Sequence, residues 1–361
     1  MQTDISTLVE VIDMSANIDE IRKLLKGLSR QDLEELNSEI TEQLEKSIGL
    51  NDFLNTCAEN RFSEGLVCPY CGKKHIVKFG RVSGKQRYRC KDCGKTFNTL
   101  TNTIFADSKL PMSAWLKYAD CMSKRLSLRK SAEIVGISLR TSFFMRHKIL
   151  SALRVDIGVD NLSGVVEMDE TFFAESFKGN HKKGNPDWVA PRKDGQSRQR
   201  GKQVSYRGIS HEQVCVSTAM DRNGSLVVVP ACNGRLTIKR LSAIYEGKIE
   251  PSSTICTDSH NAYKSFAKSI PADLVQIERG RHKNGLYHIN HINSLHSRLK
   301  DWVKQFNGFS TKYIANYMYW FNWQERNKSI SKYRQGRNVV YESISTPLLI
   351  TQPDVCATKP F

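Results

Sequence analysis

Four cysteines, arranged as two Cys-x-x-Cys pairs, constrain the fold of this chain more than any other feature. Cys68 and Cys71 form the first pair, Cys90 and Cys93 the second, and a glycine follows each pair directly. Each pair delivers two thiolates from one tight turn, so two pairs supply the four ligands of a tetrahedral zinc site. The pattern predicts a zinc ribbon over residues 61–100 with Zn²⁺ as a structural ion. Chance pairing of the cysteines and a redox site are the alternatives.

The segment between the two cysteine pairs is strand-like and strongly basic. Lysine and arginine side chains provide most of the contacts that proteins make with the phosphates of nucleic acids. We therefore expect the ribbon to touch DNA rather than only to stabilise the fold. The residues expected to make this contact are Lys85, Arg87 and Arg89.

Residues 126–150 have the pattern of two helices joined by a tight turn. Gly136 suits the turn, and Ser138 suits the N-cap of a second helix over residues 139–150. This pattern predicts a DNA-reading helix-turn-helix, with the second helix as the recognition helix. An ordinary helical hairpin is the alternative. The side chains expected to face DNA are Arg140, Arg146 and Lys148, together with Thr141 and His147.

The charge of the chain is large and unevenly distributed. The 361 residues carry a formal net charge of +17, yet residues 1–60 hold 5 Lys/Arg against 13 Asp/Glu, whereas the rest holds 49 against 24. Such a basic excess is typical of proteins that bind nucleic acid. No run of about 18 apolar residues occurs, and the N-terminus lacks the layout of a signal peptide. The sequence thus predicts a cytoplasmic protein without a membrane partner.

In the acidic segment 1–60, apolar residues recur at intervals of three and four positions, which predicts a small helical module. Ser29 and Asp32 have the spacing of a helix N-cap pair. A solvated acidic face, a dimerisation surface and an intramolecular shield for the DNA-binding surface are the three interpretations of this module.

Two short apolar runs end abruptly in aspartates, Asp169 and Asp258. Many strands end in Asp for solubility alone, so one such run says little. A second run of the same kind follows, and after it a helix-like segment carries Asn293. The chain thus presents three side chains with oxygen ligands in succession. Together they predict a metal site at a sheet edge.

The order of predicted elements also indicates a fold class. The expected order is a strand with Asp169, an insertion, a hairpin, a helix, a strand with Asp258, a further strand and a helix with Asn293. This order suits an α/β, ribonuclease-H-like mixed sheet flanked by helices. The insertion, residues 174–210, lacks the apolar content of a core and is expected to become ordered on a phosphate backbone. Its basic residues expected to bind DNA are Lys182, Lys183, Arg192, Lys193, Arg198, Arg200, Lys202 and Arg207. The expected domains are a helical module (1–60), a zinc ribbon (61–100), a helix-turn-helix domain (101–155), a catalytic domain (160–330) and a C-terminal tail (331–361).

In this order the features resemble those of bacterial insertion-sequence transposases, and more narrowly the family numbered fifteen-ninety-five. Members of that family join an N-terminal zinc ribbon to an acid-triad transposase domain. The resemblance runs from about Cys68 to Asn327 and is carried by the two cysteine pairs, Met168-Asp169-Glu170, Thr257-Asp258, the stretch from His288 to Ser294, and Arg298-Leu299-Lys300.

The resemblance implies roles for individual residues. Asp169 and Asp258 match the first two catalytic acids, Asn293 stands where the more usual pattern has Glu, and Lys300 matches the basic residue two helical turns further on. It implies two-metal phosphoryl transfer with Mg²⁺ or Mn²⁺, in which Asp169 bridges two ions, Asp258 holds one and Asn293 helps the other. The reaction implied is cleavage at the terminal inverted repeats of the element, which frees 3′-hydroxyls, and their joining to double-stranded target DNA. Since two ends must be held together, a homodimer or larger assembly is expected.

Several alternatives remain open at the level of sequence. A catalytically inactive DNA-binding regulator is favoured by the uncharged Asn293, and a plain nuclease would leave the N-terminal domains without a role. Glu170 lies beside Asp169 but on the opposite face of its strand, so it is a poor substitute for a third acid. Glu278, His288, His291 and His296 are nearby supporting ligands or structural residues.

Overall fold

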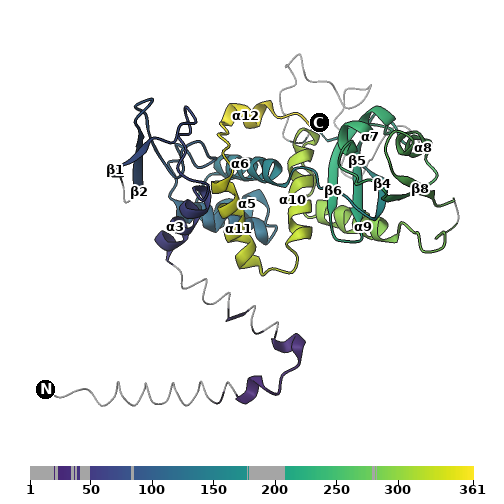
Figure 1. Ribbon diagram of the computed structural model, residues 1–361, viewed down its shortest axis with the longest axis horizontal. Coiled ribbons are helices and arrows are strands. Elements are labelled where there is room, and N and C mark those ends of the chain that lie inside the picture. The colour runs from purple at the N-terminus through teal and green to yellow at the C-terminus, as the bar shows by residue number, and fades with distance from the viewer. Residues whose placement is uncertain are drawn as a thin grey trace. The chain divides into compact units, whose positions relative to one another are not determined.

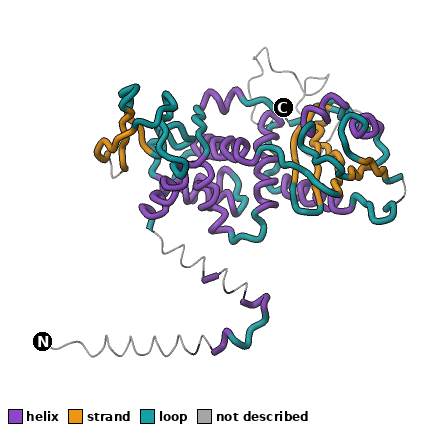
Figure 2. Tube along the Cα trace, viewed as in Figure 1, coloured by secondary structure: helices purple, strands orange, loops and turns teal. Residues whose placement is uncertain are grey.

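The structure, a computed structural model, describes residues 20, 23–33, 36, 39–40, 49–82, 85–176, 178, 208–278, 281 and 283–361. The chain divides into two compact units, Met1–Thr56 and Cys57–Phe361. In the first unit Asp32 N donates to Ser29 Oγ and Ser29 N donates to Asp32 Oδ2, each over 3.2 Å. This reciprocal pair is the predicted N-cap. Figure 2 shows the secondary structure of the described residues.

A small three-stranded antiparallel sheet follows the helix α3 (Leu50–Arg61). Its strands, in the order β1-β2-β3, are β1 (Ile76–Val82), β2 (Lys85–Cys90) and β3 (Thr96–Asn98). Cys90 ends β2, and its N–H bonds to Lys95 O, just as Cys68 N bonds to Lys73 O in the first cysteine turn. The two turns therefore have the same backbone hydrogen bond, which folds each Cys-x-x-Cys segment back on itself.

Three helices, α4 (Met112–Ser123), α5 (Leu128–Val135) and α6 (Leu139–Ile157), come next. Gly136 ends α5 in the left-handed conformation, with φ of 77°, and the hydroxyl of Ser138 accepts from Thr141 N at the start of α6. A residue with a Cβ is disfavoured at such a φ. Both residues thus act as the sequence predicted.

Residues 331–361, expected as a tail, instead form two helices, α11 (Lys332–Ser345) and α12 (Gln352–Ala357). A Cβ at Gly336 of α11 would lie 3.0 Å from the backbone of Asp120 in α4, so the two helices approach each other closely at this glycine. The side chain of Gln335 is fully buried and donates to the carbonyls of Asn327 and Ile330. Helix α11 is therefore part of the core.

A five-stranded mixed sheet has the order β6-β5-β4-β7-β8. Its strands are β4 (Val165–Ala174), β5 (Gln213–Asp221), β6 (Leu226–Asn233), β7 (Thr254–Thr257) and β8 (Asp273–Gln276). The first three form an antiparallel meander, and β7 and β8 run parallel to β4. The fold is thus mixed α/β, as predicted.

Helices cover both faces of this sheet (Figure 1). Val166 and Met168 of β4 pack in a core with residues of α7 (Ile238–Tyr245) and α8 (Asn261–Ala267). The alternate residues of β4 point to the other face, where α9 (Asn290–Lys304) lies against β4 and β5. The aromatic helix α10 (Ile314–Arg326), preceded by a short 3₁₀ turn (Thr311–Tyr313), packs along β6.

The aromatic residues of α10 belong to the core. Trp320 and Trp323 are at most 2% exposed, and Trp302 of α9 packs edge-on against Trp320 with ring centroids 5.2 Å apart. Burial of rings of this size contributes a large apolar area. No described helix has the length and apolar character that crossing a bilayer requires.

Candidate active site

Two parallel strands bring the two predicted aspartates to the same edge of the sheet. β4 pairs with β7 in the register Val165 with Thr254 and Glu167 with Cys256, and continuing this register by two residues places Asp169 level with Asp258. Asp258 is the first residue after β7. The two aspartates thus lie at adjacent strands, close enough for the charge of Asp258 to raise the pKa of Asp169, and their joint role as metal ligands stays a prediction.

The helix α9 presents His296 to Asp169. The Nδ1 atom of His296 lies 3.7 Å from Oδ2 of Asp169, and its Nε2 lies 2.7 Å from Oγ1 of Thr218 on β5. The Thr218 hydroxyl donates its single proton to the carbonyl of Asp169, over 2.8 Å. His296 Nε2 must then be the donor to Thr218, which leaves Nδ1 unprotonated and facing the carboxylate.

The electrostatics of the pair agree with this tautomer. Burial, and secondarily the nearby Lys300, lowers the pKa of His296 to about 4, so the imidazole is neutral at pH 7. Burial raises the pKa of Asp169 to about 7, with Glu170 and Asp258 acting in the same direction and Lys300 in the other. A carboxyl and an imidazole lone pair that face each other in this way form a site for a cation.

The loop that carries Asp258 is held in place by several hydrogen bonds. The carbonyl of Asp258 accepts from Gln276 Nε2 over 2.9 Å, and its carboxylate Oδ1 accepts from His260 N over 2.9 Å. Its other carboxylate oxygen, Oδ2, takes part in none of these bonds. Two aspartates with half-buried side chains supply the oxygen ligands that Mg²⁺ and Mn²⁺ prefer, so the residues fit these ions.

Asn293 and Lys300 flank His296 on α9, three residues before it and four residues after it. This spacing places all three side chains on one side of the helix. Asn293 and Lys300 are exposed, whereas His296 is 7% exposed. Of these three side chains, His296 therefore lies deepest against the sheet. The role of Asn293 as a metal ligand stays a prediction.

Glu170 points away from this cluster. Burial raises its pKa to about 7, while the neighbouring Tyr263 of α8 acts in the opposite direction. Because α8 covers the other face of the sheet, the expectation that Glu170 cannot replace a third acid agrees with its position.

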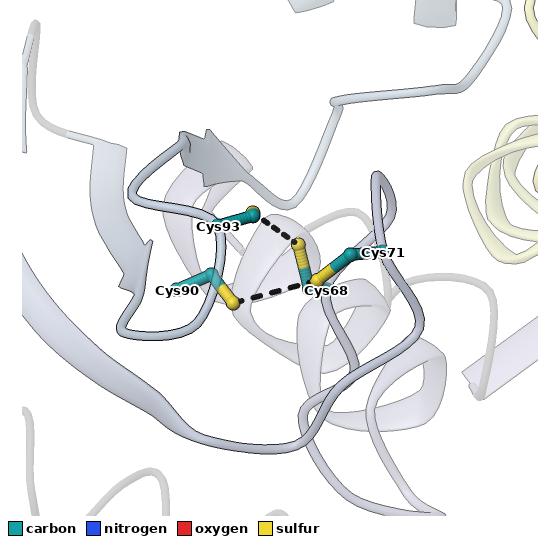
Figure 3. Close-up of side chains that lie close together, drawn as sticks. All are labelled: Cys68, Cys71, Cys90 and Cys93. Atoms are coloured by element: carbon teal, nitrogen blue, oxygen red, sulfur yellow. Dashed lines mark hydrogen bonds between the residues drawn. The ribbon is translucent and has the colours of Figure 1, made fainter.

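The four cysteines of the two pairs lie close together and point toward one another (Figure 3). Sγ of Cys68 is 3.7 Å from Sγ of Cys93, and Sγ of Cys71 is 3.6 Å from Sγ of Cys90. Tetrahedral zinc with bonds of about 2.3 Å separates its sulfur ligands by slightly less than 4 Å. The cluster therefore fits Zn²⁺.

Beside this cluster, two arginines of β2 flank an exposed aromatic ring. The guanidinium groups of Arg87 and Arg89 lie 5.7 and 5.4 Å from the centroid of Phe79, whose side chain is 44% exposed. Lys85 is also exposed. Positive charge around an accessible ring gives this surface both phosphate-binding and stacking groups.

The expectation that α6 displays Arg146 and His147 to DNA is wrong. Arg146 is 1% exposed, donates to the carbonyl of Leu126 over 2.7 Å and lies over the ring of Trp320. Burial and the neighbouring Arg146 lower the pKa of His147 to about 3. Arg140 at the start of the helix is exposed, and Lys148 is half-buried. Of Arg140, Arg146 and Lys148, only Arg140 is therefore exposed.

The basic residues predicted for the insertion, Lys182, Lys183, Arg192, Lys193, Arg198, Arg200, Lys202 and Arg207, lie outside the described residues. Their proposed contact with DNA stays a prediction.

Residues 161–326 match a family described as the ISXO2-like transposase domain. This part of the chain is thus similar to a transposase domain. The matched range holds the whole five-stranded sheet together with Asp169, Asp258 and α9.

Two further comparisons accompany the match to the transposase domain. A relative from Halobacterium salinarum, described as an uncharacterized protein in transposable element ISH50, is 28% identical over 269 residues, which are 73% of this chain and 86% of the relative. A solved structure, the crystal structure of a pre-cleavage Mos1 transpososome, is 9% identical over 65% of this chain and 80% of that chain, with a TM-score of 0.19. This last similarity is too low to support an argument.

Proposed function

We propose that this protein is a DNA transposase that binds the terminal inverted repeats of its insertion sequence, cleaves there to free 3′-hydroxyls and joins them to target DNA. The observation that carries the proposal is that Asp169, within β4, lies level with Asp258, which follows the end of the adjacent parallel strand β7, in a range that matches a transposase domain and includes α9. Carboxylates in this arrangement suit metal-dependent phosphoryl transfer.

The proposed fold of the catalytic domain is ribonuclease-H-like. Its support is the strand order β6-β5-β4-β7-β8, in which an antiparallel meander continues into two parallel strands connected through helices. Parallel connections of this type place functional groups at the carboxyl ends of the strands. Asp258 lies at such an end, and Asp169 lies level with it on the longer strand β4.

Asp169 and Asp258 would hold the catalytic Mg²⁺ or Mn²⁺ ions, with Asn293 as the proposed third ligand. Bound there, the ions would activate a water or a DNA 3′-hydroxyl and stabilise the leaving oxygen. His296 would contribute through its lone pair, which faces Asp169, and would hold that carboxyl in one orientation. Lys300, whose charge already affects both groups, would bind a DNA phosphate at the edge of the site.

The N-terminal parts of the second unit are proposed to select the DNA. The Cys68–Cys93 region would be a zinc ribbon whose Arg87 and Arg89 contact the phosphate backbone. The segment from α5 to α6 would be a helix-turn-helix that inserts the N-terminal turn of α6, with Arg140, in the major groove, since N-terminal residues of a recognition helix are the ones that reach bases. Two DNA ends must react together, so we propose a dimer or larger assembly that works in the cytoplasm.

An assay of cleavage and strand transfer on the DNA that flanks this gene tests the proposal. With Mg²⁺ or Mn²⁺ the wild-type protein should cut at the repeat ends and join them to a target duplex. Asp169→Ala and Asn293→Ala should do neither, and Asn293→Glu should retain activity. Full activity of Asn293→Ala would remove Asn293 from the ligand set. Tight binding of the ends without any cutting would favour the regulator.

A further inference from the structure

Three metal-binding side chains meet outside the Asp169 and Asp258 pair, at the N-terminus of α9. They are Glu167 of β4 and the two histidines of the sequence His288-x-x-His291. Oε1 of Glu167 lies 2.6 Å from Nδ1 of His291 and 3.3 Å from Nδ1 of His288. All three ligand atoms lie within 4.8 Å of one another. Among the residues that the structure describes, only this cluster and the four cysteines form such a group.

Backbone hydrogen bonds from the first turn of α9 hold the carboxylate of Glu167 in place. It is 1% exposed, and its Oε2 accepts the N–H groups of His291 and Ile292 over 3.1 and 3.2 Å. These are among the N–H groups that the first turn of a helix leaves without an internal partner. Oε2 therefore caps α9 while Oε1, the other oxygen, is directed at the two imidazoles.

The two imidazoles form the open side of the cluster. The side chain of His291 is 55% exposed and that of His288 is 25% exposed, and their ring centroids are 4.8 Å apart. A metal ion can thus reach Oε1 from solvent without opening the core. A buried carboxylate oxygen beside two accessible imidazole nitrogens supplies three atoms of the kinds that bind metal ions.

The chemistry of these ligands selects the type of ion. Imidazole nitrogen suits Zn²⁺ and similar transition metals rather than Mg²⁺, and two histidines with one Glu are a known zinc ligand set. Zinc bonds of about 2.0–2.1 Å separate tetrahedral ligands by about 3.3 Å, the distance between His288 Nδ1 and Glu167 Oε1. The exposed His291 ring needs to withdraw by less than about 1 Å to match.

We propose that Glu167, His288 and His291 form a binding site for a zinc-type transition-metal ion, separate from the catalytic ions and from the cysteine cluster. The ion would connect β4 to the segment that leads into α9, and would hold the helix that carries Asn293, His296 and Lys300. Glu167 and Asp169 lie two residues apart on the same face of β4, so the proposed ion would lie beside the Asp169 site. The inference goes beyond the proposed function and does not depend on it.

Calorimetric titration with Zn²⁺ tests the site in the full-length protein, purified with its cysteine-bound zinc. The starting protein is the double variant Asp169→Ala and Asp258→Ala, in which the catalytic ligands are absent. It should bind one additional Zn²⁺ per chain. Adding His288→Ala and His291→Ala should weaken this binding at least about tenfold, because even changes to groups behind a metal ligand cost 10- to 100-fold in affinity. The substitution His75→Ala, at another exposed histidine, should leave it intact.

A thermal-unfolding measurement on the same proteins gives a second readout. Zn²⁺ should raise the melting temperature of the starting protein and of its His75→Ala form, but not that of the form without His288 and His291. Glu167→Gln preserves an oxygen that can cap α9 and should also lose the zinc effect. Equal zinc binding and equal thermal shifts with and without the two histidines would overturn the proposal, whether or not the protein cleaves DNA.

Discussion

Nδ1 of His296 faces Oδ2 of Asp169 across 3.7 Å. Because Nε2 of the same ring carries the proton that is donated to Thr218, Nδ1 is unprotonated. Two groups that only accept protons therefore face each other at the edge of the sheet. This relationship connects α9 directly to the first predicted catalytic acid, and a cation or a proton between them would satisfy both.

Replacing His296 should impair catalysis much more than folding. We expect His296→Ala to lower the rate of DNA cleavage by about a hundredfold, because a misplaced reacting group costs about that much. Ser297→Ala, at an exposed neighbour on the same helix, is the matched control and should cleave normally. Single-turnover cleavage rates of the two variants test this prediction, and circular dichroism checks that both are folded. A His296→Ala protein as active as the control would leave the imidazole without a catalytic role.

The raised pKa of Asp169 makes the stability of the metal-free protein depend on pH. Because burial raises this pKa to about 7, the folded protein binds the proton more tightly than the unfolded chain does. The resulting stabilisation is fully present below pH 4 and is lost as the pH rises through 7. Asp169→Asn lacks this titration, so its stability relative to wild type should increase from pH 5 to pH 8, by about 3 kcal/mol.

Thermal unfolding of both proteins without added divalent ions measures this difference. Mg²⁺ at pH 8 should then stabilise the wild type more than Asp169→Asn, since the ion replaces the lost proton. A difference between the two proteins that stays constant with pH would contradict the assigned titration.

Loss of a zinc ligand should weaken DNA binding without unfolding the catalytic domain. Cys90→Ser removes one of the four sulfur ligands, and folding of small zinc modules depends on the ion. We expect faster hydrogen exchange in β1 and β2, unchanged exchange in the five-stranded sheet, and weaker binding to the repeat ends. Cys356→Ser, at an exposed cysteine outside the cluster, is the control. Normal binding of the ends by Cys90→Ser would show that the ribbon is dispensable for recognition.

Arg140 and Arg146 of α6 should behave in opposite ways when they are replaced. Arg146→Ala removes a buried guanidinium that donates to Leu126 O and packs on Trp320, so it should lower the free energy of unfolding by about 2–4 kcal/mol. Arg140→Ala, at an exposed position, should weaken DNA binding with little effect on stability. Denaturant unfolding and DNA-binding isotherms measured on both variants check the assignment, and the reverse pattern would contradict it.

Local signals in the sequence predicted much of this structure. Gly136 and Ser138 act within a few residues of their own positions, so the turn from α5 to α6 could be predicted from residue type alone. The expectation that an apolar run ends at each aspartate holds for Asp258, which follows β7, whereas β4 continues to Ala174 beyond Asp169, because its pairing with β5 extends the strand. Four cysteines at fixed spacing likewise predicted their own cluster.

What the sequence did not reveal depends on contacts between distant segments. The spacing of Asn293, His296 and Lys300 shows that they share one side of α9, but not which of them lies deepest against β4. Arg146 is a basic residue in the expected recognition helix, but it packs on Trp320 of α10, about 170 residues later, and donates to Leu126 O. The packing of α11 within residues 331–361 depends on Val339, Val340 and Ile344 together with the close approach of Gly336 to α4, a contact between segments more than 200 residues apart in the sequence.

The most direct test of the account is a metal-specificity switch at Asp169. Thiolate binds Mg²⁺ poorly and accepts softer ions better than carboxylate does. If Asp169 holds a catalytic ion, Asp169→Cys should fail to cleave the DNA ends with Mg²⁺ and should regain measurable cleavage with Mn²⁺, whereas the wild type works with both. Cleavage by Asp169→Cys in Mg²⁺ at the wild-type rate would show that Asp169 is not a ligand and would contradict the proposed active site.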